Sequence, residues 1–304
     1  MVKIDSHKKR LLKLASMLSV LTAVILLMVK FVAYWWTDSV SILASLLDST
    51  LDIVASLINL VAIRYALQPA DKEHPFGHGK AEALAGLGQA MFISGSAVFL
   101  IIQAATNLNE PNNLQALDFG LYVMIFSTIL TAALVLFQRH VYRQTQSVAI
   151  KADSLHYMTD LLSNSLVIVA LGLVYYGLDW MDPLMAILIG FYILHSAWQI
   201  VSESINMLLD RELGEDIQKQ VIELVLADED VVAIHEMKTR QSGHTQFIQL
   251  HVEMDGSMSL SEAHDVSERL MKELEFLYPS AEIIIHQDPY NDTVDESLRI
   301  TTPD

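Results

Sequence analysis

The 304-residue sequence contains no cysteine, and this absence removes several chemistries at once. It excludes disulfides, thiolate metal sites and thiol nucleophiles, and it leaves the redox compartment undetermined. The sequence also lacks a Walker loop and a glycine-rich dinucleotide fingerprint, so an ATP-driven pump is not expected. It has no Gly-x-Ser-x-Gly elbow and no HExxH motif, which argues against common hydrolases.

Positive charge is scarce in the last third of the chain. Residues 1–208 contain 12 Lys and Arg against 14 Asp and Glu, whereas residues 209–304 contain 7 against 22. The formal net charge of −17 is therefore almost entirely a property of the tail. An acidic domain repels nucleic acid and attracts cations, so we expect no nucleic-acid partner.

Long apolar runs fill the first two thirds. A helix needs about 20 apolar residues to cross the hydrocarbon core of a bilayer. Six stretches qualify, at roughly 11–36, 41–67, 84–107, 117–139, 148–177 and 183–208. The first is too long for a signal-peptide core and lacks a cleavage site, so we interpret it as a retained helix. We predict a six-helix transmembrane domain over 1–208, a cytoplasmic α/β domain over 209–290 and a mobile tail over 291–304.

Basic residues mark the orientation of the spans. They precede the first span and surround the second and fourth connections, and the other three connections contain none. By the positive-inside rule, both termini are cytoplasmic and the number of spans is even. One basic residue, Lys30, lies inside a span near its outer end, where its stem is expected to snorkel. The basic residues that set the orientation are Lys3, Lys8, Lys9, Arg10, Lys13, Arg64, Lys72, Lys80, Arg139, Arg143 and Lys151.

The tail has the pattern of a small α/β domain. Residues 212–227 have helical periodicity, 231–240 and 247–254 are strand-like around a Ser-Gly turn, and Ser259 or Ser261 can cap a second helix through Tyr278. A last β-branched strand covers 282–286. The order α-β-β-α-β predicts an open sheet with helices on one face, ferredoxin-like in kind.

Two of the predicted spans carry ionisable pairs. Asp48 and Asp52 are spaced i,i+4, as are His156 and Asp160, so each pair projects from one helix face. A charge at mid-bilayer costs about 2.5–3.5 kcal/mol, which is tolerable for four groups only if they face one another and share a cation. Three carboxylates and one imidazole suit tetrahedral Zn²⁺, with Cd²⁺, Fe²⁺ or Mn²⁺ as lesser candidates.

The same residues have alternative interpretations. Intramembrane acids can serve as proton relays or hold helices together without any metal. A single acid near a helix end is usually a solvated cap, and we interpret Asp153 and Asp38 in that way.

A polar loop follows the second span. Asp71, His74 and His78 fall within eight residues of a Gly/Pro-bent segment and can converge on one ion, although such loops are usually just polar. In the tail, His251 projects from the polar face of its strand, and His286 and Asp288 share a face at i,i+2. His235 and His264 lie in neighbouring elements. Surface histidines are nevertheless usually solvated, so the spacing leaves both sites open.

The two intramembrane pairs, the loop string HPFGHGKAE and the acidic α/β tail together resemble the cation diffusion facilitator family over nearly the whole chain. The resemblance implies a homodimeric metal/proton antiporter of the bacterial inner membrane that exports Zn²⁺, with Cd²⁺ or Fe²⁺ as alternative substrates. It implies a transport site of Asp48, Asp52, His156 and Asp160, and a loop site of Asp71, His74 and His78.

The resemblance extends to the tail. It implies a binuclear metal site at the dimer interface and a charge pair of Lys80 with Asp210 that links the membrane part to the tail. The implied ligands are His235, His251, His264, His286, Gln287 and Asp288.

Two rival functions fit the same residues. A metal-gated channel would use the acids as a selectivity ring and the tail as a sensor. A membrane metallohydrolase would use the four ligands catalytically, but a closed four-ligand set leaves no open position for water.

Overall fold

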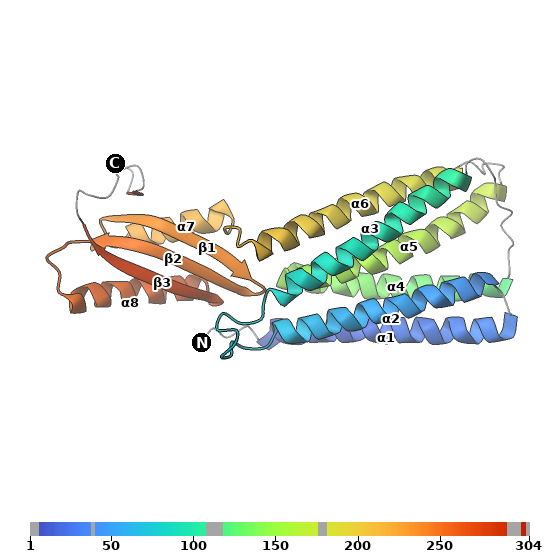
Figure 1. The fold of residues 1–304 in the computed structure, drawn as a ribbon, viewed down its shortest axis with the longest axis horizontal. Coiled ribbons are helices and arrows are strands. Elements are labelled where there is room, and N and C mark those ends of the chain that lie inside the picture. Colours follow the sequence, from blue (N-terminus) through green and yellow to red (C-terminus); the bar gives the residue numbers. More distant parts are fainter. Residues whose placement is uncertain (1–5, 38–39, 108–117, 176–180, 291–298, 302–304) are drawn as a thin grey trace. The chain divides into compact units, whose positions relative to one another are not determined.

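The computed structural model describes residues 6–37, 40–107, 118–175, 181–290 and 299–301 (Figure 1). The chain forms two compact units, one of His7–Ile205 and the other containing Asn206–Asp304. The first unit is a bundle of helices and the second is built around a small sheet. Asp38, which we predicted to be a solvated cap, lies outside the described residues.

Six long helices make up the first unit, and they correspond to the six predicted stretches. Within the residues that the structure describes, five of them are long and apolar enough to cross a membrane, and the exception is α5. In α5, Lys151, Asp153 and Asp160 interrupt the apolar sequence. The six helices are α1 (Ser6–Thr37), α2 (Val40–Ala66), α3 (Ala81–Asn107), α4 (Asp118–Thr145), α5 (Val148–Tyr175) and α6 (Met181–Leu208).

A buried apolar cluster brings α3 and α6 together. Ile93 and Ala97 of α3 form a buried cluster with Ile193 and Ala197 of α6. At Gly190 of α6, a Cβ atom would lie 2.4 Å from a side-chain carbon of Ile101. The Ile101 side chain can therefore pack this closely against α6 only because position 190 has no side chain.

Polar side chains join α5 to α1 and α2 inside the bundle. The Ser56 hydroxyl lies 2.7 Å from the Tyr157 hydroxyl and accepts a 3.2 Å hydrogen bond from Ser19. Tyr157 also donates to the carbonyl of Ser19 and is fully buried. These hydrogen bonds satisfy buried hydroxyl groups that would otherwise be costly in an apolar interior.

The second unit has the predicted order of elements. They are α7 (Glu215–Leu226), β1 (Ala233–Ser242), β2 (Thr245–Met254), α8 (Leu260–Leu277) and β3 (Ala281–Pro289). The sheet has the order β1-β2-β3, with β1 and β2 antiparallel and β2 and β3 parallel. Ser259 caps α8 through a reciprocal pair of hydrogen bonds with Glu262, so the capping prediction is confirmed for Ser259.

One face of the sheet packs against both helices. Leu250 and Val252 of β2 are buried with Val221 of α7 and Leu270 of α8 in one apolar cluster. The predicted alternation of β2 is confirmed, because the side chains between these residues project to the other face.

Most of the predicted mobile tail, 291–298 and 302–304, lies outside the described residues. Residues 299–301 are described, and Ile300 forms an antiparallel bridge with Ile234 of β1. The two backbone hydrogen bonds of this bridge measure 3.0 and 2.8 Å.

Candidate metal sites

Three groups of side chains in the described residues have ligand atoms close enough to hold one metal ion each, and every member of these groups is a candidate ligand named from the sequence. The first joins Asp52 of α2 to His156 and Asp160 of α5, with one ligand atom from each within 4.8 Å of the others. His156 Nε2 lies 3.1 Å from Asp52 Oδ1, and both residues are buried. The helix periodicity that places His156 and Asp160 on one face thus aims them at α2.

Asp48 is not among these converging residues. It lies one turn before Asp52 on α2 and is exposed. Lys30 of α1 lies on the same side as Asp48, and its amino group donates to the Ser49 hydroxyl at 2.6 Å and to the Ser45 carbonyl at 3.2 Å. Lys30 therefore reaches across to α2. The sequence had instead predicted that its stem would snorkel toward the membrane surface.

Our interpretation of Asp153 as a solvated cap is wrong, because its exposed fraction is 0%. Its carboxylate accepts hydrogen bonds from the side-chain amides of Gln89 on α3 at 3.1 Å and Gln138 on α4 at 2.6 Å. The carboxylate thus joins α3, α4 and α5 one turn from His156. The error arose because α3 and α4 cover a position that α5 alone would leave exposed.

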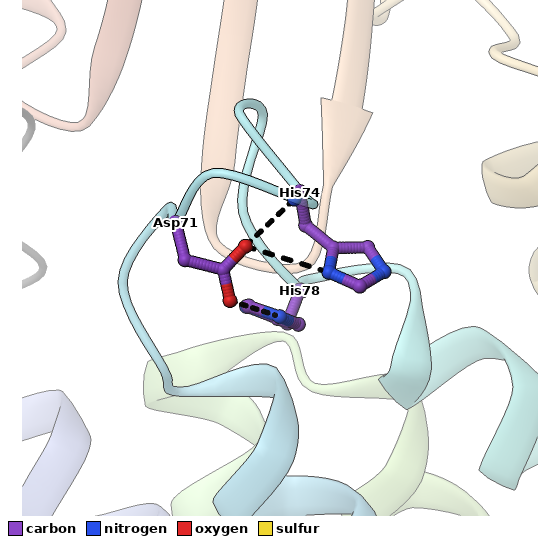
Figure 2. Close-up of side chains that lie close together, drawn as sticks. All are labelled: Asp71, His74 and His78. Atoms are coloured by element: carbon purple, nitrogen blue, oxygen red, sulfur yellow. Dashed lines mark hydrogen bonds and ion pairs between the residues drawn. The ribbon is translucent and has the colours of Figure 1, made fainter.

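The second group lies in the loop between α2 and α3 (Figure 2). Asp71 stands between the two imidazoles: its Oδ1 lies 3.5 Å from His74 Nδ1 and its Oδ2 lies 3.4 Å from His78 Nε2. Gly77, with a φ of 79°, permits the tight turn that brings His78 back toward Asp71. The His78 side chain is buried against the ring of Tyr65, at a centroid distance of 4.5 Å.

Backbone amides fix the Asp71 carboxylate in this loop. The His74 amide donates to Oδ1 at 2.7 Å and the Glu73 amide donates to it at 2.9 Å. The hydrogen bond from the His74 amide is the main reason that the pKa of Asp71 lies below its usual range. The loop therefore presents a charged carboxylate to the two imidazoles.

The third group lies on the face of the sheet opposite to the helices. His235 of β1, His251 of β2 and Asp288 of β3 have ligand atoms that all lie within 4.8 Å of one another. Asp288 Oδ2 is 2.7 Å from His251 Nδ1 and 3.3 Å from His235 Nε2. The strand register explains the convergence, since His251 pairs with His235 on one side and with His286 on the other.

The remaining predicted tail residues lie at different distances from this group. The His286 ring lies tilted against that of His251 with centroids 4.5 Å apart, and its Nε2 is 3.2 Å from Asp288 Oδ1. His264 is exposed and lies near Glu268 on α8, whereas the side-chain amide of Gln287 donates to Ser267. Lys80 and Asp210 belong to different units, so their charge pair stays a prediction.

Sequence reasoning gave no role to Glu253 and Arg299. Glu253 shares the outer face of β2 with His251 at i,i+2 and pairs in register with Asp288, so strand alternation was an available signal. Its complete burial was not predictable, because it depends on residues beyond position 298.

Comparison with known proteins gives matches along most of the chain. Residues 16–209 match the model of the cation efflux transmembrane domain, and residues 213–290 match that of the cation efflux protein cytoplasmic domain. The chain is 47% identical over 285 residues to the cation-efflux pump FieF of Yersinia enterocolitica, covering 94% of this chain and 95% of the relative. The FieF proteins of Yersinia pestis and Yersinia pseudotuberculosis match with the same identity and coverage.

These matches confirm the family expected from the motifs, and they show that the chain is similar to the FieF pumps. They agree with the apolar helices of the first unit and with an acidic domain that follows them. No enzyme family is indicated, in keeping with the prediction of a transporter. The chain belongs to the cation efflux, or cation diffusion facilitator, family of membrane transporters.

Proposed function

We propose that this protein exports Zn²⁺ by metal/proton antiport, as a homodimer in a bacterial inner membrane with α1–α6 as six spans and both termini cytoplasmic. The observation that carries the proposal is the convergence of Asp52, His156 and Asp160 from two helices within a predominantly apolar bundle. Buried acids and imidazole at membrane depth are expensive unless they serve a substrate ion.

The donor set favours zinc as the substrate. Carboxylate oxygens and an imidazole nitrogen suit Zn²⁺, and tetrahedral coordination needs four such ligands. Asp48 completes the set in our proposal, because it lies one turn from Asp52 on the same helix face. Cd²⁺ and Fe²⁺ are alternative substrates for the same ligands.

Proton exchange follows from the chemistry of these ligands. Imidazole and carboxylate bind either a proton or a metal, so metal binding releases protons. We propose that a metal entering from the cytoplasm displaces the proton held between His156 and Asp52. Protons from the more acidic outside then displace the metal from these ligands. Between the two steps, α2 and α5 move from an inward-open to an outward-open arrangement.

We propose that the loop and tail groups hold metal ions for regulation or structure. The loop group lies at the cytoplasmic end of α2 and α3 in the proposed topology. The tail group belongs to the domain that we propose forms the dimer contact. Membrane lipid, protons and divalent metal ions are the other expected partners.

Reconstituted protein tests the proposal. Proteoliposomes would report zinc entry with an internal zinc dye and proton movement with a pH dye. We expect zinc flux in one direction to be matched by proton flux in the other, and an imposed pH gradient to drive zinc uphill. Zinc flux without proton flux would favour the metal-gated channel and contradict antiport.

A further inference from the structure

A carboxylate outside the three groups lies on the metal-binding face of the tail. Glu253 projects from the same face of β2 as His251, and its exposed fraction is 0%. Its Oε2 makes no hydrogen bond within the described part of the chain, and neither does His235 Nε2. Buried polar atoms without hydrogen bonds are uncommon in folded proteins, and a bound ion is one of the explanations for them.

The spacing between these atoms is that of two ligands on one zinc ion. Zn–N and Zn–O bonds of about 2.0–2.2 Å at a tetrahedral angle separate two donor atoms by roughly 3.4 Å. His235 Nε2 lies 3.5 Å from Glu253 Oε1 and 3.3 Å from Asp288 Oδ2. Glu253 is therefore at ligand spacing from His235, although it is not one of the three residues whose ligand atoms all lie within 4.8 Å.

Arg299 forms an ion pair with the Glu253 carboxylate. Its Nε lies 3.0 Å from Glu253 Oε1, the oxygen that also faces His235, and its side chain is only 6% exposed. The guanidinium lies over the ring of Tyr290 at 4.8 Å. The bridge between Ile300 and Ile234 anchors the next residue to the edge of β1.

We propose that Glu253 is a further ligand of the tail metal site, held away from the metal by Arg299. The guanidinium and the metal ion compete for Oε1, the oxygen that faces His235, because two positive charges held at bonding distance from one oxygen repel each other. When metal recruits Glu253, Arg299 loses its ion pair with that carboxylate, and the bridge at Ile300 loosens. Residues 299–301 thus report metal occupancy of the tail. This inference rests on the tail group binding zinc, as the proposed function includes.

Hydrogen exchange of the full-length protein in detergent, titrated with zinc, tests the inference locally. We expect zinc to protect the peptide around His251 and, over the same concentration range, to speed exchange at Ile300. Arg299→Gln should lower the zinc concentration for half-protection about tenfold, since a competing cation is removed beside the site. Arg269→Gln is the matched control, because it removes the same charge from an exposed pair with Asp228 and should leave this concentration unchanged.

A second variant keeps the test decisive if Arg299→Gln destabilises the domain by leaving Glu253 unpaired. Glu253→Gln removes both the ligand and the charge that holds Arg299. The zinc concentration for half-protection of the peptide around His251 should therefore rise about tenfold, and zinc should no longer change exchange at Ile300. Tighter binding in Arg299→Gln should also disappear when Glu253→Gln is added. Two results would overturn this inference and leave the tail site standing. One is zinc protection around His251 in the unaltered protein with no change of exchange at Ile300, and the other is weaker zinc binding by Arg299→Gln. Absence of zinc protection at His251 would overturn the tail site as well.

Discussion

His156 Nε2 lies 3.1 Å from Asp52 Oδ1, although the two residues are 104 positions apart and belong to different helices. At this distance the pair shares a proton, and a metal ion bound by both side chains would have to take its place. Under the proposed metal binding, proton and metal occupancy would be mutually exclusive at the point where α2 meets α5. This exclusion is what an antiporter needs, and a simple pore does not need it.

Removing the carboxylate of Asp52 should abolish transport. Asp52→Asn keeps the shape of the side chain but removes the negative charge and one metal-ligating oxygen. We expect saturable zinc uptake into inverted vesicles to fall to the background of empty vesicles. Asp216→Asn, at an exposed position in the first turn of α7, is the matched control and should leave uptake unchanged. Uptake by Asp52→Asn at the rate of the unaltered protein would refute the assignment of the transport site.

The buried carboxylate of Asp153 should stabilise the helix bundle. Asp153→Ala would leave the side-chain amides of Gln89 and Gln138 without their acceptor, at a cost of about 1–3 kcal/mol for each group left unsatisfied. We expect a lower unfolding temperature in detergent, monitored by tryptophan fluorescence. Asp153→Asn should lose less, because its amide oxygen can still accept one of the two hydrogen bonds. Equal stability of Asp153→Ala and the unaltered protein would show that these hydrogen bonds contribute nothing.

The loop around Asp71 should keep its conformation in moderately acidic solution. The pKa of Asp71 is lowered by the hydrogen bonds that its carboxylate accepts from the His74 and Glu73 amides. These bonds therefore stabilise the loop fully at any pH above the usual pKa of a carboxyl group. This contribution is lost only when the pH falls through the lowered pKa. Without added metal, exchange of the His74 amide, corrected for its intrinsic pH dependence, should therefore stay slow through about pH 4.

Asp71→Asn provides the comparison for this measurement. It removes the charge that the amides stabilise, so the His74 amide should exchange faster at neutral pH. Lys72→Gln changes the charge of a neighbouring exposed residue and should have no effect. Opening of the loop in the unaltered protein already at the ordinary carboxyl pKa would contradict the prediction.

Local patterns were sufficient to predict some features and not others. The apolar runs gave the helices of the first unit, and i,i+4 spacing placed His156 and Asp160 on one face. Alternation in β2 gave the apolar face that packs against α7 and α8. These features repeat within a single element, so the sequence of that element determines them.

The features that sequence analysis missed depend on contacts between distant segments. Asp153 is buried because Gln89 and Gln138, on two other helices, cover it. Glu253 lies on a strand face that alternation marks as polar, and it is buried where Arg299 and Ile300 return to the sheet. The periodic pattern of β2 or of α5 alone therefore does not predict that Glu253 and Asp153 are buried.

Changing His251 should separate tail metal binding from transport. His251 contacts both other members of the tail group, since its Nδ1 is 2.7 Å from Asp288 and its ring lies 4.9 Å from that of His235. His251→Ala should therefore reduce the zinc retained per protomer after desalting, measured by mass spectrometry of the metal. Transport at saturating zinc should persist, because Asp52, His156 and Asp160 are untouched. Asp52→Asn should show the reverse pattern, with tail zinc retained and transport lost. Loss of transport in a folded His251→Ala protein would instead make the tail metal part of the transport cycle itself.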